Sequence, residues 1–187
     1  MIDFMQMPVK QGSFKLALAA ACLLLASNAL HASETKAVPA QADFDHQAEF
    51  NALHALAGTW LGVDQRGNEV QVDFRLTAGG SVLVETWTFA NDRESLTLYH
   101  MDGERMIATH YCPIGNQPRL QLKRKLNDGT LEFEFMDATN LPDMLQAHEH
   151  AFDMQVLDAD IFVRNETYLS DGESSSNGIR FTRQEGP

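Results

Sequence analysis

The stretch VQVDFRL, Val70 to Leu76, carries the pattern that decides the fold of this chain. Apolar residues stand at every second position in it, and polar or charged residues stand between them. Because successive side chains of a β-strand point to opposite faces, the pattern predicts a strand with one apolar and one solvated face. The stretch LEFEF, Leu131 to Phe135, predicts the same arrangement.

Turn residues separate such strands at hairpin spacing. The turns are Arg66-Gly67-Asn68, Gly79-Gly80, Asp102-Gly103, Asn127-Asp128-Gly129, Asp158-Ala159-Asp160 and Asp171-Gly172. A sheet of consecutive hairpins exposes two long edges, and closure into a barrel removes both. We therefore predict an all-β fold, a closed or nearly closed up-and-down antiparallel β-barrel of about 8–10 strands rather than a sandwich. Its apolar faces line an interior that is filled by side chains or holds one small ligand.

A short amphipathic helix is predicted before the first strand. Phe50, Leu53 and Leu56 recur at every third position, and Asp43 or Asp45 can cap the helix start. A glycine follows at position 58 and ends the pattern. We expect residues 43–187 to form a single barrel domain, with the small and polar residues 33–42 as a flexible linker before it.

Residues 1–32 have the features of a bacterial signal peptide. Lys10 and Lys15 precede an apolar run at 16–26, which is too short to span a bilayer. Small residues and a polar break follow that run, so cleavage after Ala29 or Ala32 is expected. The leader predicts a periplasmic or secreted protein without stable membrane insertion once it is removed.

Two alternatives to a cleaved leader are open. Cys22 follows three alanines and could carry a lipid anchor, although it lies in the middle of the apolar run. The run could also be retained as a membrane anchor. With either alternative the barrel domain after the linker is unchanged.

The charge of the chain argues against two classes of partner. The formal net charge is −12 at pH 7. Nucleic acids and anionic membrane surfaces both require clustered Lys and Arg residues. The basic cluster Lys123, Arg124 and Lys125 stands just before a turn among acidic strands, and we interpret it as a solvated edge. We therefore expect no nucleic acid partner.

The triplet Gly58-Thr59-Trp60 stands directly after the predicted helix, at the start of the first predicted strand. It resembles the Gly-x-Trp signature of the calycins, the superfamily of lipocalins and fatty-acid-binding proteins. In those barrels the Trp closes the base and an Arg or Lys from the last strand packs across it. The resemblance implies structural roles for Trp60 and Arg183, with Arg183 lying over the indole as a cation over a ring.

A second resemblance rests on Thr109 to Cys112, Gly115 to Arg119, and His148-x-His150. Together these stretches are similar to a set of small exported bacterial lipocalin-like proteins of unassigned function. This resemblance covers about residues 50 to 183. It implies a fold and a compartment, and it supplies no activity.

The stretch HEHAFDMQV, which begins at His148, predicts a strand with two histidines on its apolar face. A period of two places His148 and His150 with Phe152, in the barrel interior, and Glu149 on the solvated face. Residues two apart on a strand are separated by roughly 7 Å, so both imidazoles can reach one zinc ion. The two histidines are therefore candidate ligands of a metal or haem.

A metal site of this kind needs a third protein ligand, and His110 or His100 could supply it. The alternative is that His148 and His150 are structural residues with hydrogen-bonding neighbours, or that they lie in water at the barrel mouth. The residues do not identify a cofactor.

The stretch MIATHYCPIGNQPR, Met106 to Arg119, concentrates polar chemistry in a predicted loop at one end of the barrel. Its candidate ligand-binding residues are His110, Tyr111, Asn116 and Arg119. A loop that caps the barrel with its own hydrogen bonds fits these residues, and so does a recognition patch at the mouth of a pocket. The loop also holds Cys112, which is the single cysteine left after the leader, so no intramolecular disulfide is possible and burial of the thiol is expected.

Glu85 shares a predicted strand face with Trp87 and Phe89. A buried carboxylate there needs a cationic partner, for which Arg105 or Arg119 is a candidate. The alternative is a position at the solvated rim. Periodicity does not choose between the two.

The sequence favours a binding protein over an enzyme. We expect an exported lipocalin-like barrel that holds a small, mostly apolar molecule, oriented by His110, Tyr111, Asn116, Arg119, His148 and His150. A metal or haem protein using His148 and His150 is the first alternative. An enzyme of isomerase or hydrolase type is the second, with the same histidines acting beside Tyr99 or Tyr111 as acid and base. The ligand, the oligomeric state and the state of the cysteine are not determined by these patterns.

Overall fold

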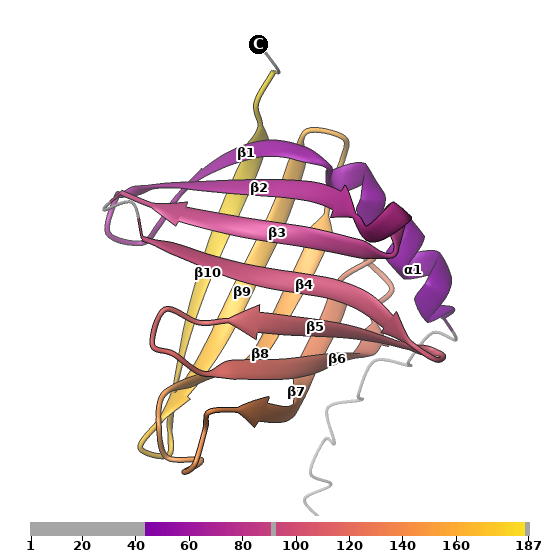
Figure 1. Ribbon diagram of the computed structural model, residues 1–187. Helices are drawn as coiled ribbons and strands as arrows, with labels where there is room; N and C mark the ends of the chain where they lie inside the picture. Colours follow the sequence, from indigo (N-terminus) through magenta and orange to yellow (C-terminus); the bar gives the residue numbers. More distant parts are fainter. Residues whose placement is uncertain (1–43, 91–92, 186–187) are drawn as a thin grey trace, which may run out of the picture. The chain divides into compact units, whose positions relative to one another are not determined.

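The structure is a computed structural model that describes residues 44–90 and 93–185 (Figure 1). The predicted leader and linker lie outside the described residues. The elements follow one another as α1 (His46–Leu53), a 3-10 turn (His54–Leu56), β1 (Gly58–Val63), β2 (Glu69–Thr77), a second 3-10 turn (Ala78–Gly80), β3 (Val82–Phe89), β4 (Glu94–Asp102), β5 (Arg105–Tyr111), β6 (Gln117–Lys125), β7 (Leu131–Thr139), β8 (His148–Val156), β9 (Ile161–Ser170) and β10 (Glu173–Arg183).

The strands form a closed antiparallel barrel in which each strand pairs with its neighbours in the chain and β1 pairs with β10 (Figure 1). The prediction of an all-β up-and-down barrel with a short helix before it is confirmed. Closure leaves no free sheet edge in the strand order, which is the physical reason for preferring a barrel to an open sheet.

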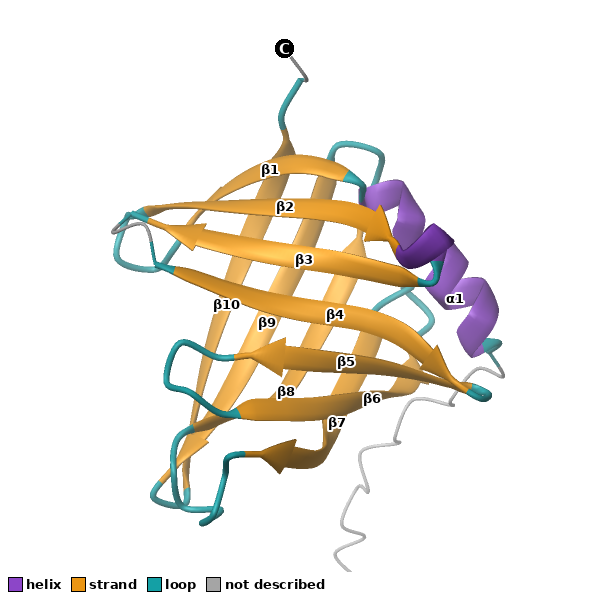
Figure 2. Ribbon diagram, viewed as in Figure 1, coloured by secondary structure: helices purple, strands orange, loops and turns teal. Residues whose placement is uncertain are grey.

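The helix α1 lies at one end of the barrel (Figure 2). Asp45 is its N-cap, and the Asp45 side chain accepts a hydrogen bond of 2.8 Å from the backbone N–H of Gln47. The three apolar positions that predicted the helix, Phe50, Leu53 and Leu56, are all buried in the core. The helix therefore contributes side chains to the interior at its end of the barrel.

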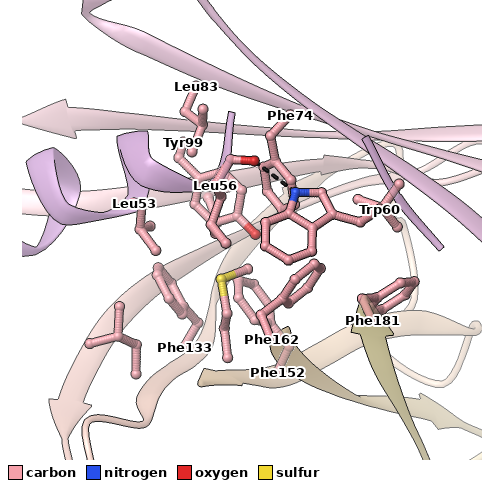
Figure 3. Packing of buried hydrophobic residues seen from close by; sticks show 14 of the residues in the cluster. Leu53, Leu56, Trp60, Phe74, Leu83, Tyr99, Phe133, Phe152, Phe162 and Phe181 are labelled. Carbon is pink, nitrogen blue, oxygen red and sulfur yellow. Dashed lines mark hydrogen bonds between the residues drawn. The ribbon is translucent and has the colours of Figure 1, made fainter. Parts of the chain in front are cut away.

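Trp60 and Arg183 face each other where β1 meets β10. The guanidinium carbon of Arg183 lies 4.1 Å from the ring of Trp60, the arrangement expected from the calycin resemblance. The Trp60 indole N–H donates to the carbonyl of Leu56 at 2.8 Å (Figure 3). Arg183 donates to the carbonyls of Ala57 at 2.9 Å and Ala55 at 2.7 Å. These bonds tie the helical segment to the closing strands.

Aromatic side chains fill the barrel interior, both next to α1 and in the middle of the barrel (Figure 3). Phe162 stacks on Phe181 with ring centroids 4.7 Å apart, and Trp60 meets Phe162 edge-on at 4.9 Å. Phe133 stacks on Phe152 at 4.4 Å. These buried side chains form a packed core inside the barrel at the α1 end.

Candidate functional site

A cluster of charged side chains lies inside the barrel around Arg164, which has no exposed surface. One guanidinium nitrogen, Nη1, donates to Glu85 at 2.8 Å and to the Tyr99 hydroxyl at 2.5 Å. The other, Nη2, donates to Glu149 at 3.2 Å and to Glu166 at 3.5 Å. We refer to these five residues as the Arg164 cluster.

Neighbouring groups donate hydrogen bonds to both oxygens of Glu85, the carboxylate nearest to Arg164. Its Oε1 accepts a hydrogen bond of 2.9 Å from the indole N–H of Trp87, and its Oε2 accepts one of 2.7 Å from Tyr99. The Phe152 ring lies under the guanidinium, with its centroid 3.6 Å from the Arg164 Cζ. Buried charges need such partners, because losing their hydration is otherwise costly.

The alternation of β9 explains how Arg164 enters the interior. Phe162, Arg164, Glu166 and Tyr168 occupy alternate positions of this strand, and Phe162 belongs to the apolar core. Side chains two apart on a strand share a face, so the three polar residues follow Phe162 into the barrel. This alternation is visible in the sequence, but Arg164, Glu166 and Tyr168 were not among the predicted site residues.

Glu149 of β8 also lies inside the barrel, although it was expected on the solvated face of its strand. The pairing of β8 with β9 shifts register between Glu149 and Ala151, leaving His150 as an extra residue. This bulge reverses the alternation, so Glu149 shares the inner face with Phe152 and both are buried. The prediction that Glu149 lies on the solvated face is wrong for this reason.

His110 joins the Arg164 cluster from β5, where it is buried. Its Nδ1 lies 3.1 Å from the Thr97 hydroxyl and 3.6 Å from a carboxylate oxygen of Glu149, and its Nε2 lies 3.5 Å from the Tyr168 hydroxyl. Burial lowers the pKa of His110 to about 4. The imidazole is therefore neutral near pH 7.

Two carboxyl groups of the cluster hold their protons to higher pH than usual. Burial, with repulsion from Glu85, raises the pKa of Glu149 to about 7 although Arg164 opposes the shift. Burial, with repulsion from Glu149, raises the pKa of Glu166 to about 7. The interior therefore changes its charge near neutral pH.

A pocket of about 220 Å³ opens beside the cluster, at the end of the barrel opposite α1. Its apolar walls include Trp87, Phe89, Pro113 and Ile114. Its polar lining comprises Arg93, Ser95, Cys112, Glu166 and Tyr168. We call it the mouth pocket. Glu166 belongs to both the mouth pocket and the Arg164 cluster, so it links the cavity to the buried charges.

The thiol and the phenol of the mouth pocket are both protonated at neutral pH. Burial raises the pKa of Cys112, although the backbone of Ile114 and the side chain of Tyr168 oppose this shift. Burial, with repulsion from Glu166 and Glu149, raises the pKa of Tyr168. The pocket therefore offers weak hydrogen-bond donors next to one carboxyl group.

His148 and His150 pack against each other and against Phe135. The Nδ1 of His150 lies 3.4 Å from the Nε2 of His148, and the His150 ring stacks on Phe135. The Nδ1 of His148 lies 2.8 Å from the Gln146 carbonyl, which fixes the proton on that nitrogen. Ladder pairing between β7 and β8 runs from Leu131 to Glu134, so these rings lie beyond it.

The polar residues of the predicted loop separate from one another. Tyr111 is 44 % exposed. Arg119 lies on the outside and forks onto Asp137 of β7. The buried Asn116 donates at 2.8 Å to the carbonyl of Ala147, which lies outside the loop, and its Oδ1 has no hydrogen-bond partner among the described residues. Of the six predicted ligand-binding residues, His110 is the one that contacts the Arg164 cluster.

Glu85 is buried, but neither of the two arginines expected to pair with it, Arg105 and Arg119, is its partner. Arg105 pairs with Asp102 and Arg119 pairs with Asp137, both on the surface. Arg164 takes that place instead.

Within the described residues, no group of three or more His, Cys, Asp or Glu side chains could hold a metal ion. In the same part of the chain, no helix has the length and apolar character needed to cross a bilayer.

No protein-family model matches the chain, and no curated protein sequence matches it. Similar solved structures include a protein with unknown function from the DUF3598 family of Nostoc punctiforme PCC 73102, at 15 % identity and a TM-score of 0.49. That match covers 71 % of this chain, which spans only 49 % of the DUF3598 protein. Rv2717c from M. tuberculosis has 16 % identity and a TM-score of 0.52, over 73 % of this chain and 97 % of that protein. The likeness to Rv2717c shows a shared fold, and the ten-stranded barrel is consistent with a calycin-like architecture.

Proposed function

We propose that this chain is an exported lipocalin-like barrel that binds a small, mostly apolar molecule in the mouth pocket. The supporting observation is the pocket itself, which has aromatic walls at Trp87 and Phe89 and a polar floor at Glu166 and Tyr168. Apolar walls with a few convergent polar groups are typical of ligand sites. The barrel interior near α1 is packed with side chains, so a ligand held inside the barrel would occupy the mouth pocket.

The volume limits the ligand to about the size of one ring with a substituent. An apolar cavity of about 150 Å³ holds benzene, and drug-sized ligands use roughly 300–1,000 Å³. The mouth pocket, at about 220 Å³, lies between these values. A long fatty acid or an intact haem exceeds this volume unless the loops around the pocket move.

Binding can be measured by the fluorescence of Trp87 on titration with single-ring compounds. Ala147 lines the pocket, so Ala147→Phe should fill it and abolish the fluorescence change. Ala159→Phe, in the exposed turn between β8 and β9, adds the same volume away from the pocket and should bind as the wild type does. Equal binding by both variants contradicts a ligand site at the mouth.

Export is part of this proposal and rests on the signal-peptide pattern of residues 1–32. Fractionation of a bacterial host that expresses the full chain, followed by N-terminal sequencing, tests it. Recovery outside the cytoplasm with a new terminus after Ala29 or Ala32 supports export, and an intact cytoplasmic chain contradicts it.

Metal or haem ligation by His148 and His150 stays a prediction. Metal analysis and an absorption spectrum after addition of haemin test it, with the double variant His148→Ala and His150→Ala as the comparison. Unchanged metal content or spectrum in the double variant rejects ligation by this pair. An isomerase- or hydrolase-type activity also stays a prediction, and no substrate for it follows from the residues.

A further inference from the structure

We propose that the mouth pocket selects small ring compounds that carry a protonated amine, with the ammonium group held by the Glu166 carboxylate. This inference rests on the proposed ligand-binding function and names the class of ligand. It follows from where the carboxylates and Arg164 lie relative to the cavity, and from the aromatic walls.

Glu166 is the carboxylate of the Arg164 cluster that the cavity reaches. Its side chain is 15 % exposed and lines the pocket, whereas Glu85 and Glu149 have no exposed side-chain surface. Its contact with Arg164 Nη2, at 3.5 Å, is longer than the 2.8 Å contact between Arg164 and Glu85. Glu166 is therefore the carboxylate with the longest contact to Arg164 and the one that a ligand can touch.

The charge of the cluster favours a cation at this position. Arg164 forms ion pairs with three carboxylates, so negative charge is in excess when all three are ionised. One oxygen of Glu149, Oε2, is buried without a hydrogen-bond partner. An ammonium group beside Glu166 supplies the missing positive charge in a site where burial strengthens ion pairs.

The same arrangement disfavours an anionic ligand such as a fatty acid. Arg164 has no exposed surface and does not line the pocket, so a ligand carboxylate cannot reach its guanidinium. Arg93 lines the pocket, but it is exposed and its guanidinium lies over the Phe89 ring at 5.5 Å. Exposed charges are screened by solvent and salt, whereas the mostly buried Glu166 carboxylate is screened much less.

The aromatic walls of the pocket suit both the ring and the ammonium group of such a ligand. The Trp87 and Phe89 rings line the pocket, with centroids 6.1 Å apart. Aromatic faces attract a nearby ammonium group and also bury the apolar part of the ligand. Pro113 and Ile114 add apolar surface.

The groups that face Glu166 make amine binding depend on pH. They are Arg164 and Tyr168 on β9, Glu149 on β8, His110 on β5, Glu85 on β3, Cys112 after β5, and Arg93 on the pocket wall. Tyr168 and Cys112 have raised pKa values and stay neutral below pH 8, and His110 is neutral above about pH 5. The pH dependence between 6 and 8 therefore comes from the two carboxyl groups, Glu149 and Glu166, which release protons there.

Three ring compounds of similar size differ in charge and so test its contribution to binding: benzylamine, benzyl alcohol and benzoate. Calorimetric or fluorescence titration of the wild-type protein at pH 8 should give an affinity for benzylamine at least about tenfold above those for the other two. The benzylamine affinity should fall by about tenfold between pH 8 and pH 6, because the carboxyl groups take up protons, while the benzyl alcohol affinity stays constant. Benzylamine itself stays protonated throughout this range.

A matched pair of variants locates the charge. Glu166→Gln should remove the preference for benzylamine and keep the affinity for benzyl alcohol, whereas Glu94→Gln, an exposed residue at the start of β4, should change neither. If Glu166→Gln does not fold, the wild-type series over pH decides the matter. Benzoate binding as tightly as benzylamine, or a benzylamine affinity independent of pH, overturns this inference alone. Binding of none of the three probes overturns the proposed function as well.

Discussion

Glu85 and Arg164 are 79 residues apart in the chain, and the Nη1 of Arg164 donates to the Oε2 of Glu85 at 2.8 Å in a fully buried ion pair. Their strands, β3 and β9, do not pair with each other in the barrel, so the contact crosses the interior. This ion pair anchors the charged layer that separates the packed core near α1 from the mouth pocket. It makes the interior polar beside the mouth pocket.

Removal of the Arg164 charge should be strongly destabilising. Arg164→Met leaves Glu85, Glu149 and Glu166 inside the barrel without their cation, and breaking a buried ion pair in this way costs about 3–5 kcal/mol. Arg119→Met, which breaks an exposed pair with Asp137, should cost no more than about 1 kcal/mol. Urea unfolding followed by far-ultraviolet circular dichroism measures both losses. Similar losses for the two variants would show that the buried cluster is not a stabilising centre.

The folded protein should lose stability as the pH rises from about 4.5 to about 7. Glu149 and Glu166 have folded-state pKa values of about 7, against an ordinary value of 4.5, so the folded state keeps protons that the unfolded state has released. Their stabilising contribution is complete below pH 4.5 and is lost as the pH rises through 7. His110, with a pKa of about 4 against 6.5, acts in the opposite direction between pH 4 and 6.5, and so do His46 and His150, whose pKa values burial lowers. The decline should therefore be clearest between about pH 6.5 and 7.

Melting temperatures between pH 4.5 and 8 test this dependence in the wild type, Glu166→Gln and Glu94→Gln. Glu166→Gln should flatten the decline by a few degrees, because it removes one of the two titrating carboxyl groups. Glu94→Gln should follow the wild type. A Glu166→Gln profile parallel to that of the wild type contradicts a raised pKa at this residue.

The contact between Arg183 and Trp60 should stabilise the closure of β1 on β10. Arg183→Lys keeps the positive charge but loses the planar fork that bonds the carbonyls of Ala55 and Ala57, so we expect a loss of about 1–2 kcal/mol. Chemical unfolding measures it. The control is Arg180→Lys, an exposed residue of the same strand, which should change little. Equal stability of the two variants rules out a closing role for Arg183.

The Cys112 thiol should react slowly with iodoacetamide at neutral pH. Burial raises its pKa, and the thiolate is the reactive form. Peptide mass spectrometry should show slower labelling of Cys112 than of glutathione in the same tube, and slower still with benzylamine present, because the thiol lines the mouth pocket. Labelling as fast as that of glutathione contradicts a partly buried thiol with a raised pKa. Labelling unaffected by a bound ligand places that ligand elsewhere.

The sequence patterns were sufficient to predict the barrel. Alternation in Val70 to Leu76 and in the other strands specifies one apolar face per strand, and hairpin turns specify which strands pair. These are local properties, so they can be read along the chain. The structural roles of Trp60 and Arg183 were expected from the resemblance to the calycins, not from local patterns.

The candidate site could be predicted only in part, because its residues depend on register and on contacts across the barrel. Alternation alone would have grouped Arg164 and Glu166 with Phe162, but it could not say that Arg164 meets Glu85 on β3. The bulge at His150 moved Glu149 inward and reversed an inference that assumed a regular strand.

The sequence by itself determined the class of fold, because strand periodicity and turn chemistry act between neighbours in the chain. The tertiary structure decided that the polar centre is Arg164 rather than His148 and His150. A buried charge is tolerated only where partners from distant strands converge on it, and that convergence exists only once the barrel has closed.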